Sequence, residues 1–184
     1  MGKVIFQMIV SLDGYYEGPG KEIDWHVVDE KFNEYSIDML NNTEVLVYGR
    51  ATYQIMQAFW PLPEAVKNFP QVAGLMNGLP KVVFSKTLQK TDWQNTRLAK
   101  GTLEEEIVKL KKESVKNIMI GGSDLAISIS ELGLIDEYRI IVAPIVLSSG
   151  KPIFHGIKER LPLKLIQSTT FSSGNMLLCY EPVK

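Results

Sequence analysis

Residues 117–133 read NIMIGGSDLAISISELG, and this stretch decides the fold. The apolar run ending at Ile120 predicts a buried strand, the glycines and serine after it predict a tight turn, and the residues beyond predict a helix that ends at Gly133. The same order of strand, glycine and helix occurs in residues 44–58, EVLVYGRATYQIMQA. Two such units in one chain are typical of an α/β protein.

The rest of the chain supplies further strands and helices. Strands are expected at residues 3–10 and 81–84 and near 95–99, and helices at 29–41, capped by Asp29, and at 103–113, where Thr102 and Glu105 match a capping box. Three strand candidates then follow one another at 136–143, 163–171 and 175–181. Strands that first alternate with helices and then pair directly predict a mixed, mostly parallel sheet flanked by helices, with an antiparallel hairpin at its C-terminal end.

The composition excludes several classes of protein. The chain has 184 residues, 45% of them hydrophobic, and this length predicts one domain spanning residues 1–184. Its 20 basic and 21 acidic residues give a net charge of −1, which lacks the positive excess that nonspecific nucleic-acid binding requires. The apolar runs are much shorter than the roughly 20 residues of a membrane helix, and the first residues do not form a secretion signal. We therefore expect a cytoplasmic protein with no nucleic-acid or membrane partner.

Residues that bind metals in proteins are scarce in this chain. It contains two histidines, His26 and His155, and one cysteine, Cys179, without an H-E-x-x-H or C-x-x-C spacing. No metal site is therefore expected. The G-x-S-x-G motif of many serine hydrolases is also absent, which argues against that class of enzyme.

The turns after three strands carry residues that suit phosphate binding, because a helix N-terminus offers unpaired N–H groups and a partial positive charge to an anion. The candidates are Gly49, Arg50 and Thr52 at one junction, Gly121, Gly122 and Ser123 at the other, and Ser85 and Lys86, followed by Thr87, after the strand at 81–84. The guanidinium of Arg50 matches a phosphate monoester such as the 2′-phosphate of NADP. Neither the dinucleotide G-x-G-x-x-G motif nor a P-loop occurs, and ordinary turns with a capping serine and a solvent-facing arginine are the alternative interpretation.

Four motifs in this order resemble a known family. They are SLDGY at 11–15, VYGRATY at 47–53, IMIGGSDL at 118–125, and the segments LIDEY, IVAPIVL and GKPIF between residues 134 and 154. Over nearly the whole chain these motifs resemble the dihydrofolate-reductase-like fold. They resemble most closely the stand-alone RibD C-terminal domain, the reductase half of the bifunctional riboflavin-biosynthesis deaminase/reductase.

This resemblance implies NADPH bound across the ends of the strands. It implies Gly49, Arg50 and Thr52 on one side of the cofactor, Gly121, Gly122 and Ser123 at the pyrophosphate, and Ser85 and Lys86 at the adenosine end. It also implies a cis peptide bond between the two glycines and a homodimer. The activity expected is NADPH-dependent reduction of a pyrimidine or pteridine-like heterocycle, similar to 5-amino-6-(5-phosphoribosylamino)uracil. A dihydrofolate reductase and a catalytically silent NADP-binding module are the alternatives.

Hydride transfer also needs a group that binds the substrate and delivers a proton. Asp29 is the first candidate for this carboxylate and Asp13 the second, although helix capping or a turn explains each of them equally well. The candidate cations for an anionic part of the substrate are Lys151, Lys158 and Arg160. The chain departs from the family where Ser148 and Ser149 replace a glycine-containing turn, and it lacks the deaminase's zinc motif.

Overall fold

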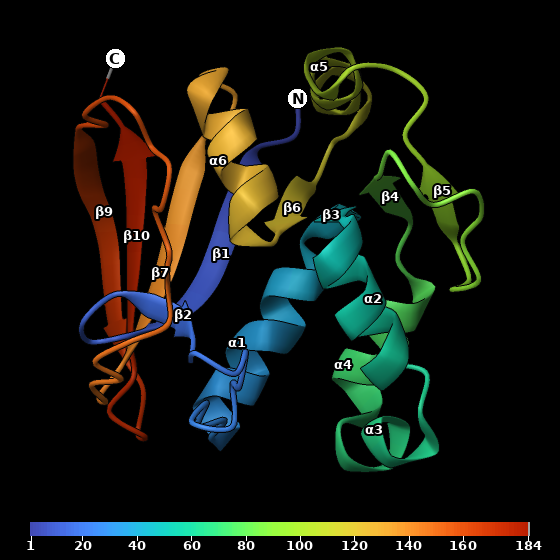
Figure 1. Cartoon of the computed structure of the whole chain (residues 1–184). Coiled ribbons are helices and arrows are strands. Elements are labelled where there is room, and N and C mark those ends of the chain that lie inside the picture. The colour runs from blue at the N-terminus through green and yellow to red at the C-terminus, as the bar shows by residue number, and fades with distance from the viewer. Residues whose placement is uncertain (184) are drawn as a thin grey trace.

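An eight-stranded mixed sheet forms the centre of the protein, as the computed structural model of residues 1–183 shows (Figure 1). Its strand order is β5-β4-β3-β6-β1-β7-β10-β9, and a separate two-stranded sheet pairs β2 with β8. The strands are β1 (Val4–Ser11), β2 (Tyr15–Glu17), β3 (Thr43–Gly49), β4 (Lys81–Phe84), β5 (Thr96–Leu98), β6 (Asn117–Gly121), β7 (Glu137–Ala143), β8 (Lys151–Pro152), β9 (Leu163–Thr170) and β10 (Met176–Pro182).

The sheet is parallel from β5 to β7 and antiparallel only where β10 joins β7 and β9 joins β10. Strands β1, β3, β6 and β7 are rich in β-branched residues and are covered by helices, as expected for the buried centre of a parallel sheet. The predicted fold class, a mostly parallel α/β sheet with an antiparallel C-terminal hairpin, is confirmed.

Helices cover both faces of the sheet. They are α1 (Glu30–Asn41), α2 (Arg50–Phe59), α3 (Pro63–Asn68), α4 (Pro70–Gly78), α5 (Leu103–Glu113) and α6 (Ser123–Glu131). Helices α5 and α6 pack on one face around residues such as Phe6 and Ile118, and α1, α2 and α4 pack on the other around Ile5 and Met119 (Figure 1). The predicted caps are present, because Asp29 accepts the N–H of Phe32, and Thr102 and Glu105 form the capping box.

Two parts of the structure differ from the prediction. Residues 59–80 contain α3 and α4, for which no helices were predicted in a stretch interrupted by prolines. Pro63 and Pro70 instead occupy the first position of each helix, where the missing N–H costs nothing. The pairing of β2 with β8 is also not predicted, because neither strand is longer than three residues. Within residues 1–183, no helix is long and apolar enough to cross a membrane.

Candidate active site

The carboxyl ends of β3 and β6 lie side by side and form the centre of the candidate site. Tyr48 of β3 pairs with Gly121 of β6, and Gly49 pairs with Phe84 of β4. After β3 the chain passes through α2 toward β4, whereas after β6 it passes through α6 on the opposite face toward β7. The two helices therefore diverge between β3 and β6. Ligands of open α/β sheets bind at such a point, outside the carboxyl ends of the strands.

The two glycines of this junction lack side chains, so Thr52 of α2 and Tyr48 of β3 pack closely against their backbone. A Cβ atom at Gly122 would overlap the hydroxyl oxygen of Thr52, and one at Gly121 would overlap the ring of Tyr48. Gly122 also has a φ of 97°, a backbone conformation that other residues rarely adopt. The structure thus brings Thr52, Gly121 and Gly122 together. We call this group the cradle.

Arg50, at the first position of α2, lies beside the turn that follows β4. Its guanidinium donates a 2.8 Å hydrogen bond to the hydroxyl of Thr87, and both side chains are exposed. The Ser85 hydroxyl accepts the N–H groups of Thr87 and Leu88, at 3.1 and 3.0 Å, and so shapes this turn. Lys86 is exposed on the same turn. Arg50 therefore lies beside the turn that carries Ser85 and Lys86, and a role of these residues in binding adenosine phosphate stays a prediction.

The structure contradicts the alternative interpretation of Ser123 as a helix cap, and it lacks the expected cis bond. Ser123 is not the cap of α6, because Gly122 holds that position and Ser123 is the first helical residue. The Ser123 hydroxyl is buried and donates to the carbonyl oxygen of Ile153. Only the backbone N–H of Ser123 therefore remains to bind an anion. Residues 1–183 contain no cis peptide bond, so the cis bond expected between Gly121 and Gly122 is not found.

Asp29 and Asp13, the candidate carboxylates, both accept backbone N–H groups from distant parts of the chain. Asp29 accepts from Phe32 at 2.7 Å and from Ser173 at 2.6 Å, and the bond from Phe32 is the largest cause that lowers the pKa of its carboxyl. Asp13 accepts from the Ser11 hydroxyl at 2.7 Å, which contributes most to lowering its pKa. Both side chains are therefore stabilised in the ionised form, as hydrogen-bond acceptors.

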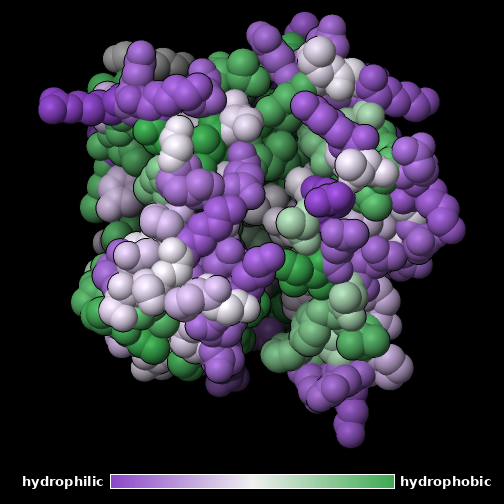
Figure 2. Space-filling view, in the orientation of Figure 1, coloured by the Kyte–Doolittle hydropathy of each residue, from purple (hydrophilic) through white to green (hydrophobic). Residues whose placement is uncertain are grey.

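A cleft of about 380 Å³ begins at Asp29 and lies between the first turn of α1 and the junction of α3 with α4. Figure 2 shows the surface hollowed between these two parts of the molecule. The lining residues are Val28, Asp29, Glu30, Asn33, Asn68, Phe69, Pro70 and Gln71. Of these residues only Asp29 was a predicted site residue, and the last four belong to the stretch whose helices were not predicted. Of the two candidate carboxylates, only Asp29 lines the cleft.

The three candidate cations do not form one cluster. Lys151 binds the carboxylate of Asp124 through two contacts of 2.9 Å. Lys158 lies 3.4 Å from Glu131 and its side chain is 82% exposed, and Arg160 is exposed as well. The charges of Lys151 and Lys158 are thus each matched by a carboxylate on α6.

Comparison with known proteins places this geometry in context. The model of the RibD C-terminal domain family matches residues 2–177. The uncharacterized protein YyaP of Bacillus subtilis is 35% identical over 180 residues, which cover 97% of this chain and 94% of YyaP. A deaminase/5-amino-6-(5-phosphoribosylamino)uracil reductase from Thermotoga maritima is similar in structure, with a TM-score of 0.71 and 16% identity over 99% of this chain and 57% of that one. Dihydrofolate reductase from Enterococcus faecalis, solved with NADP(H), has a TM-score of 0.66 and 16% identity over 100% of this chain and 98% of its own.

Proposed function

This chain belongs to the RibD C-terminal domain family, and from that premise we propose that it is an NADPH-dependent reductase of a pyrimidine or pteridine-like heterocycle. The observation that carries the proposal is the cradle, where Thr52 packs directly against the backbone of the glycine turn at the point at which α2 and α6 diverge. A Cβ at Gly122 would overlap Thr52, and one at Gly121 would overlap Tyr48, so the turn requires glycine at both positions. The N-termini of the two helices add unpaired N–H groups, so the residues fit a diphosphate.

The chain's own residues would bind the cofactor from both sides of this point. The N–H groups at the start of α6 and the hydroxyl of Thr52 suit the diphosphate, and the exposed guanidinium of Arg50 suits the 2′-phosphate. Ser85 and Lys86 lie beside Arg50, where they would bind the adenosine end. NADPH supplies a hydride when it is bound, and the protein orients the substrate and excludes water.

The cleft beside Asp29 is the proposed substrate site. Its carboxylate accepts two backbone N–H groups, which stabilise the ionised form. An ionised carboxylate at the rim of a cleft accepts hydrogen bonds from ring N–H or amino groups, which pyrimidines and pteridines carry. We propose that Asp29 binds the heterocycle in this way, and that Asp13, which does not line the cleft, holds the loop that follows β1.

We also propose a cytoplasmic homodimer. Strand β9 lies at the edge of the sheet, and seven of its eight residues are exposed. Leu165 is 50% and Ile166 42% exposed on this strand, and Met176 of the neighbouring β10 is 42% exposed. An edge strand with exposed apolar residues is a template for pairing with another chain, and a second copy would cover it.

The test compares NADPH and NADH binding by calorimetry in the wild type and in Arg50→Ala. A lost charge-assisted contact costs about 1.5–3 kcal/mol, so the dissociation constant for NADPH should rise roughly 10- to 100-fold while that for NADH stays the same. Lys109→Ala, which removes an exposed positive charge from α5, serves as the control and should change neither constant. Equal losses for the two cofactors in Arg50→Ala would contradict the role of Arg50.

A turnover screen with NADPH then separates the possible activities. Reduction of the ribosylaminopyrimidine supports the proposal, and reduction of dihydrofolate alone would make the protein a dihydrofolate reductase. Tight NADPH binding without turnover of either compound would identify a catalytically silent NADP-binding module. If NADPH produces no thermal shift at all, the proposal fails.

A further inference from the structure

The loop that follows β1, residues 12–28, is fastened to a second segment, residues 144–155. The N–H of Leu12 donates to the carbonyl of Ile145 at 2.7 Å. The carboxylate of Asp13 accepts the N–H groups of Leu147 and Ser148, at 3.1 and 2.8 Å, and holds Ser148 at a φ of 63°. Further along, β2 pairs with β8, and the N–H of Ile153 donates to the carbonyl of Gly14 at 3.0 Å. The two segments are therefore joined mainly through their backbones.

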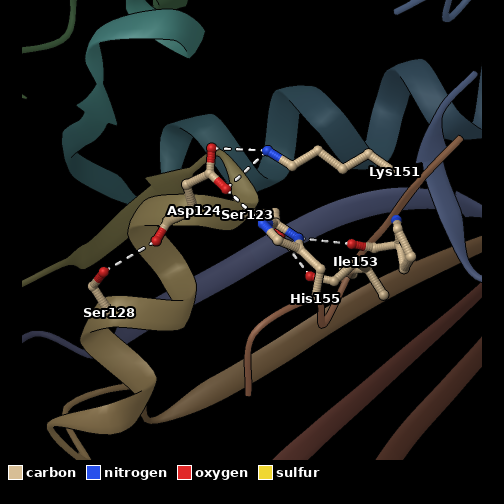
Figure 3. Close-up of polar contacts among 7 residues, drawn as sticks. Ser123, Asp124, Ser128, Lys151, Ile153 and His155 are labelled. Atoms are coloured by element: carbon tan, nitrogen blue, oxygen red, sulfur yellow. Dashed lines mark hydrogen bonds and ion pairs between the residues drawn. The ribbon is translucent and has the colours of Figure 1, made fainter. Parts of the chain in front are cut away.

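The second segment is in turn fastened to the first turn of α6 (Figure 3). The Asp124 carboxylate accepts from the ammonium of Lys151 at 2.9 Å and from a ring nitrogen of His155 at 2.7 Å. Next to it, the hydroxyl of Ser123 donates to the carbonyl of Ile153. Asp124 therefore lies between the cradle glycines, two residues before it, and the segment that holds the β1 loop.

Lys151 contacts the β1 loop as well as α6. Its ammonium lies 5.7 Å from the centre of the Tyr16 ring, and its backbone pairs with Glu17 in β2. Partial burial opposes ionisation of Asp124, but the hydrogen bonds and charges of Lys151 and His155 outweigh it, so the pKa of the carboxyl is below its usual value. Lys151 thus connects the loop to the carboxylate directly, through one side chain.

The contacts of Asp124 differ in kind from those of Asp13. Both residues are exposed, and the Asp124 side chain is 69% exposed. Asp13 binds two backbone N–H groups, whereas Asp124 depends on the side chains of Lys151 and His155, and solvent weakens ion pairs of that kind. Substitution of Asp124 therefore removes side-chain contacts and leaves the backbone contacts of Asp13 in place.

We infer that Asp124 is a positioning residue, whose carboxylate couples the first turn of α6 to the β1 loop through Lys151 and His155. The loop and the cradle then move together. The coupling itself depends only on the contacts above, whereas its use, to close the loop when a cofactor occupies the cradle, rests on the proposed function. By linkage, a cofactor that fixes the first turn of α6 also favours the closed loop.

Hydrogen exchange of the ligand-free protein, followed by mass spectrometry, tests the coupling. In Asp124→Ala, peptides that cover residues 12–28 should exchange about three- to tenfold faster, because one tether of a locally opening segment is lost. The matched control is Glu131→Ala, which breaks the exposed pair with Lys158 at the other end of α6 and should leave these peptides unchanged. Unchanged exchange in Asp124→Ala, or an equal effect in the control, would overturn the inference.

Three further measurements separate coupling from simple loss of structure. Exchange within α6 must stay at the wild-type rate, because fraying of the helix would otherwise explain the result. Asp124→Asn keeps an acceptor oxygen and should restore part of the protection. Lys151→Ala leaves the contact of Asp124 with His155, so it should have part of the effect of Asp124→Ala, and the effects of the two substitutions should not add. Additive effects would contradict a shared contact.

Exchange in the presence of NADPH then tests how the coupling is used. In the wild type, saturating NADPH should slow exchange in residues 12–28, and in Asp124→Ala it should protect α6 but not the loop. Equal protection of the loop in both proteins would refute the link between cradle and loop. A wild type that shows no change with NADPH anywhere would count against the proposed function, while the ligand-free result would still decide the coupling.

Discussion

Replacing Gly122 by alanine tests the cradle most directly. Gly122 has a φ of 97° and a ψ of 131°, a region that side chains other than glycine rarely occupy, so alanine costs about 1–3 kcal/mol in backbone strain. Its Cβ would also overlap the Thr52 hydroxyl oxygen and lie 3.3 Å from the Thr52 Cβ. Overpacking of this kind costs about 1–3 kcal/mol more, which gives roughly 2–6 kcal/mol in total.

Gly133, which follows the C-cap of α6, provides the matched control. It also has a positive φ, 65°, but no heavy atom lies within 4 Å of the position of a Cβ, so Gly133→Ala adds strain without overlap. That strain costs about 1–2 kcal/mol. For a chain of this length each 1 kcal/mol lowers the Tm by about 2–4 °C, so thermal and urea unfolding should resolve the two variants.

A second variant separates the two contributions at Gly122. In the double variant Gly122→Ala/Thr52→Ala the hydroxyl is absent, so the overlap is reduced while the backbone strain remains. We expect its stability to lie between those of Gly122→Ala and Gly133→Ala, and NADPH to bind Gly133→Ala as it binds the wild type. If Gly122→Ala is no less stable than Gly133→Ala, the close approach of Thr52 to the turn does not exist as described.

Two other predictions concern pH and assembly. The Glu106 carboxylate accepts hydrogen bonds from Arg97 and from the N–H groups of Lys100 and Gly101, with those from Arg97 the largest cause, and the pKa falls from 4.5 to about 2. The ionised carboxylate therefore stabilises the native state by about 3 kcal/mol above pH 4.5, and this stabilisation is lost as the pH falls toward 2. The free energies of unfolding in urea of the wild type and of Glu106→Gln should therefore converge as the pH falls. A difference that stays constant with pH would contradict this. For the homodimer, light scattering should show that the double variant Leu165→Lys/Ile166→Lys is a monomer. The control Val115→Lys, at a residue that is 84% exposed and lies outside β9, should remain a dimer. If both variants are dimers, the interface does not include β9.

The two strand–glycine–helix units could be predicted because their signals are local. In each unit an apolar run, a glycine and the start of a helix lie within about 17 consecutive residues. The sheet then brings the two turns together, because both strands end at the same edge. The helix at 103–113 was predicted with the bounds that the structure shows, since its capping box lies within four residues. Such elements depend on residues that lie close together in the sequence, so a local pattern is enough to predict them.

Lys81 shows what local patterns do not contain. At the start of β4 it is only 1% exposed, and its ammonium donates to the carbonyls of Leu79 at 2.7 Å and Asn77 at 3.2 Å, above the ring of Trp93. Burial lowers its pKa to about 8. The sequence predicts a strand here but not the burial of this side chain. The carbonyls that accept hydrogen bonds from the ammonium lie at the C-terminal end of α4, and this helix was not predicted.

The roles of the two candidate carboxylates depend on contacts across most of the chain. Asp29 meets Ser173, and Asp13 meets Leu147 and Ser148, at separations of 134 residues or more. From the sequence, a carboxylate before a helix suits catalysis and capping equally. The structure distinguishes the two residues by their surroundings. Asp29 lines the cleft while it caps α1, whereas Asp13 only joins its own loop to Leu147 and Ser148. A residue that caps a helix at the rim of a cleft is held rigidly, and this rigidity is what a substrate-binding carboxylate requires.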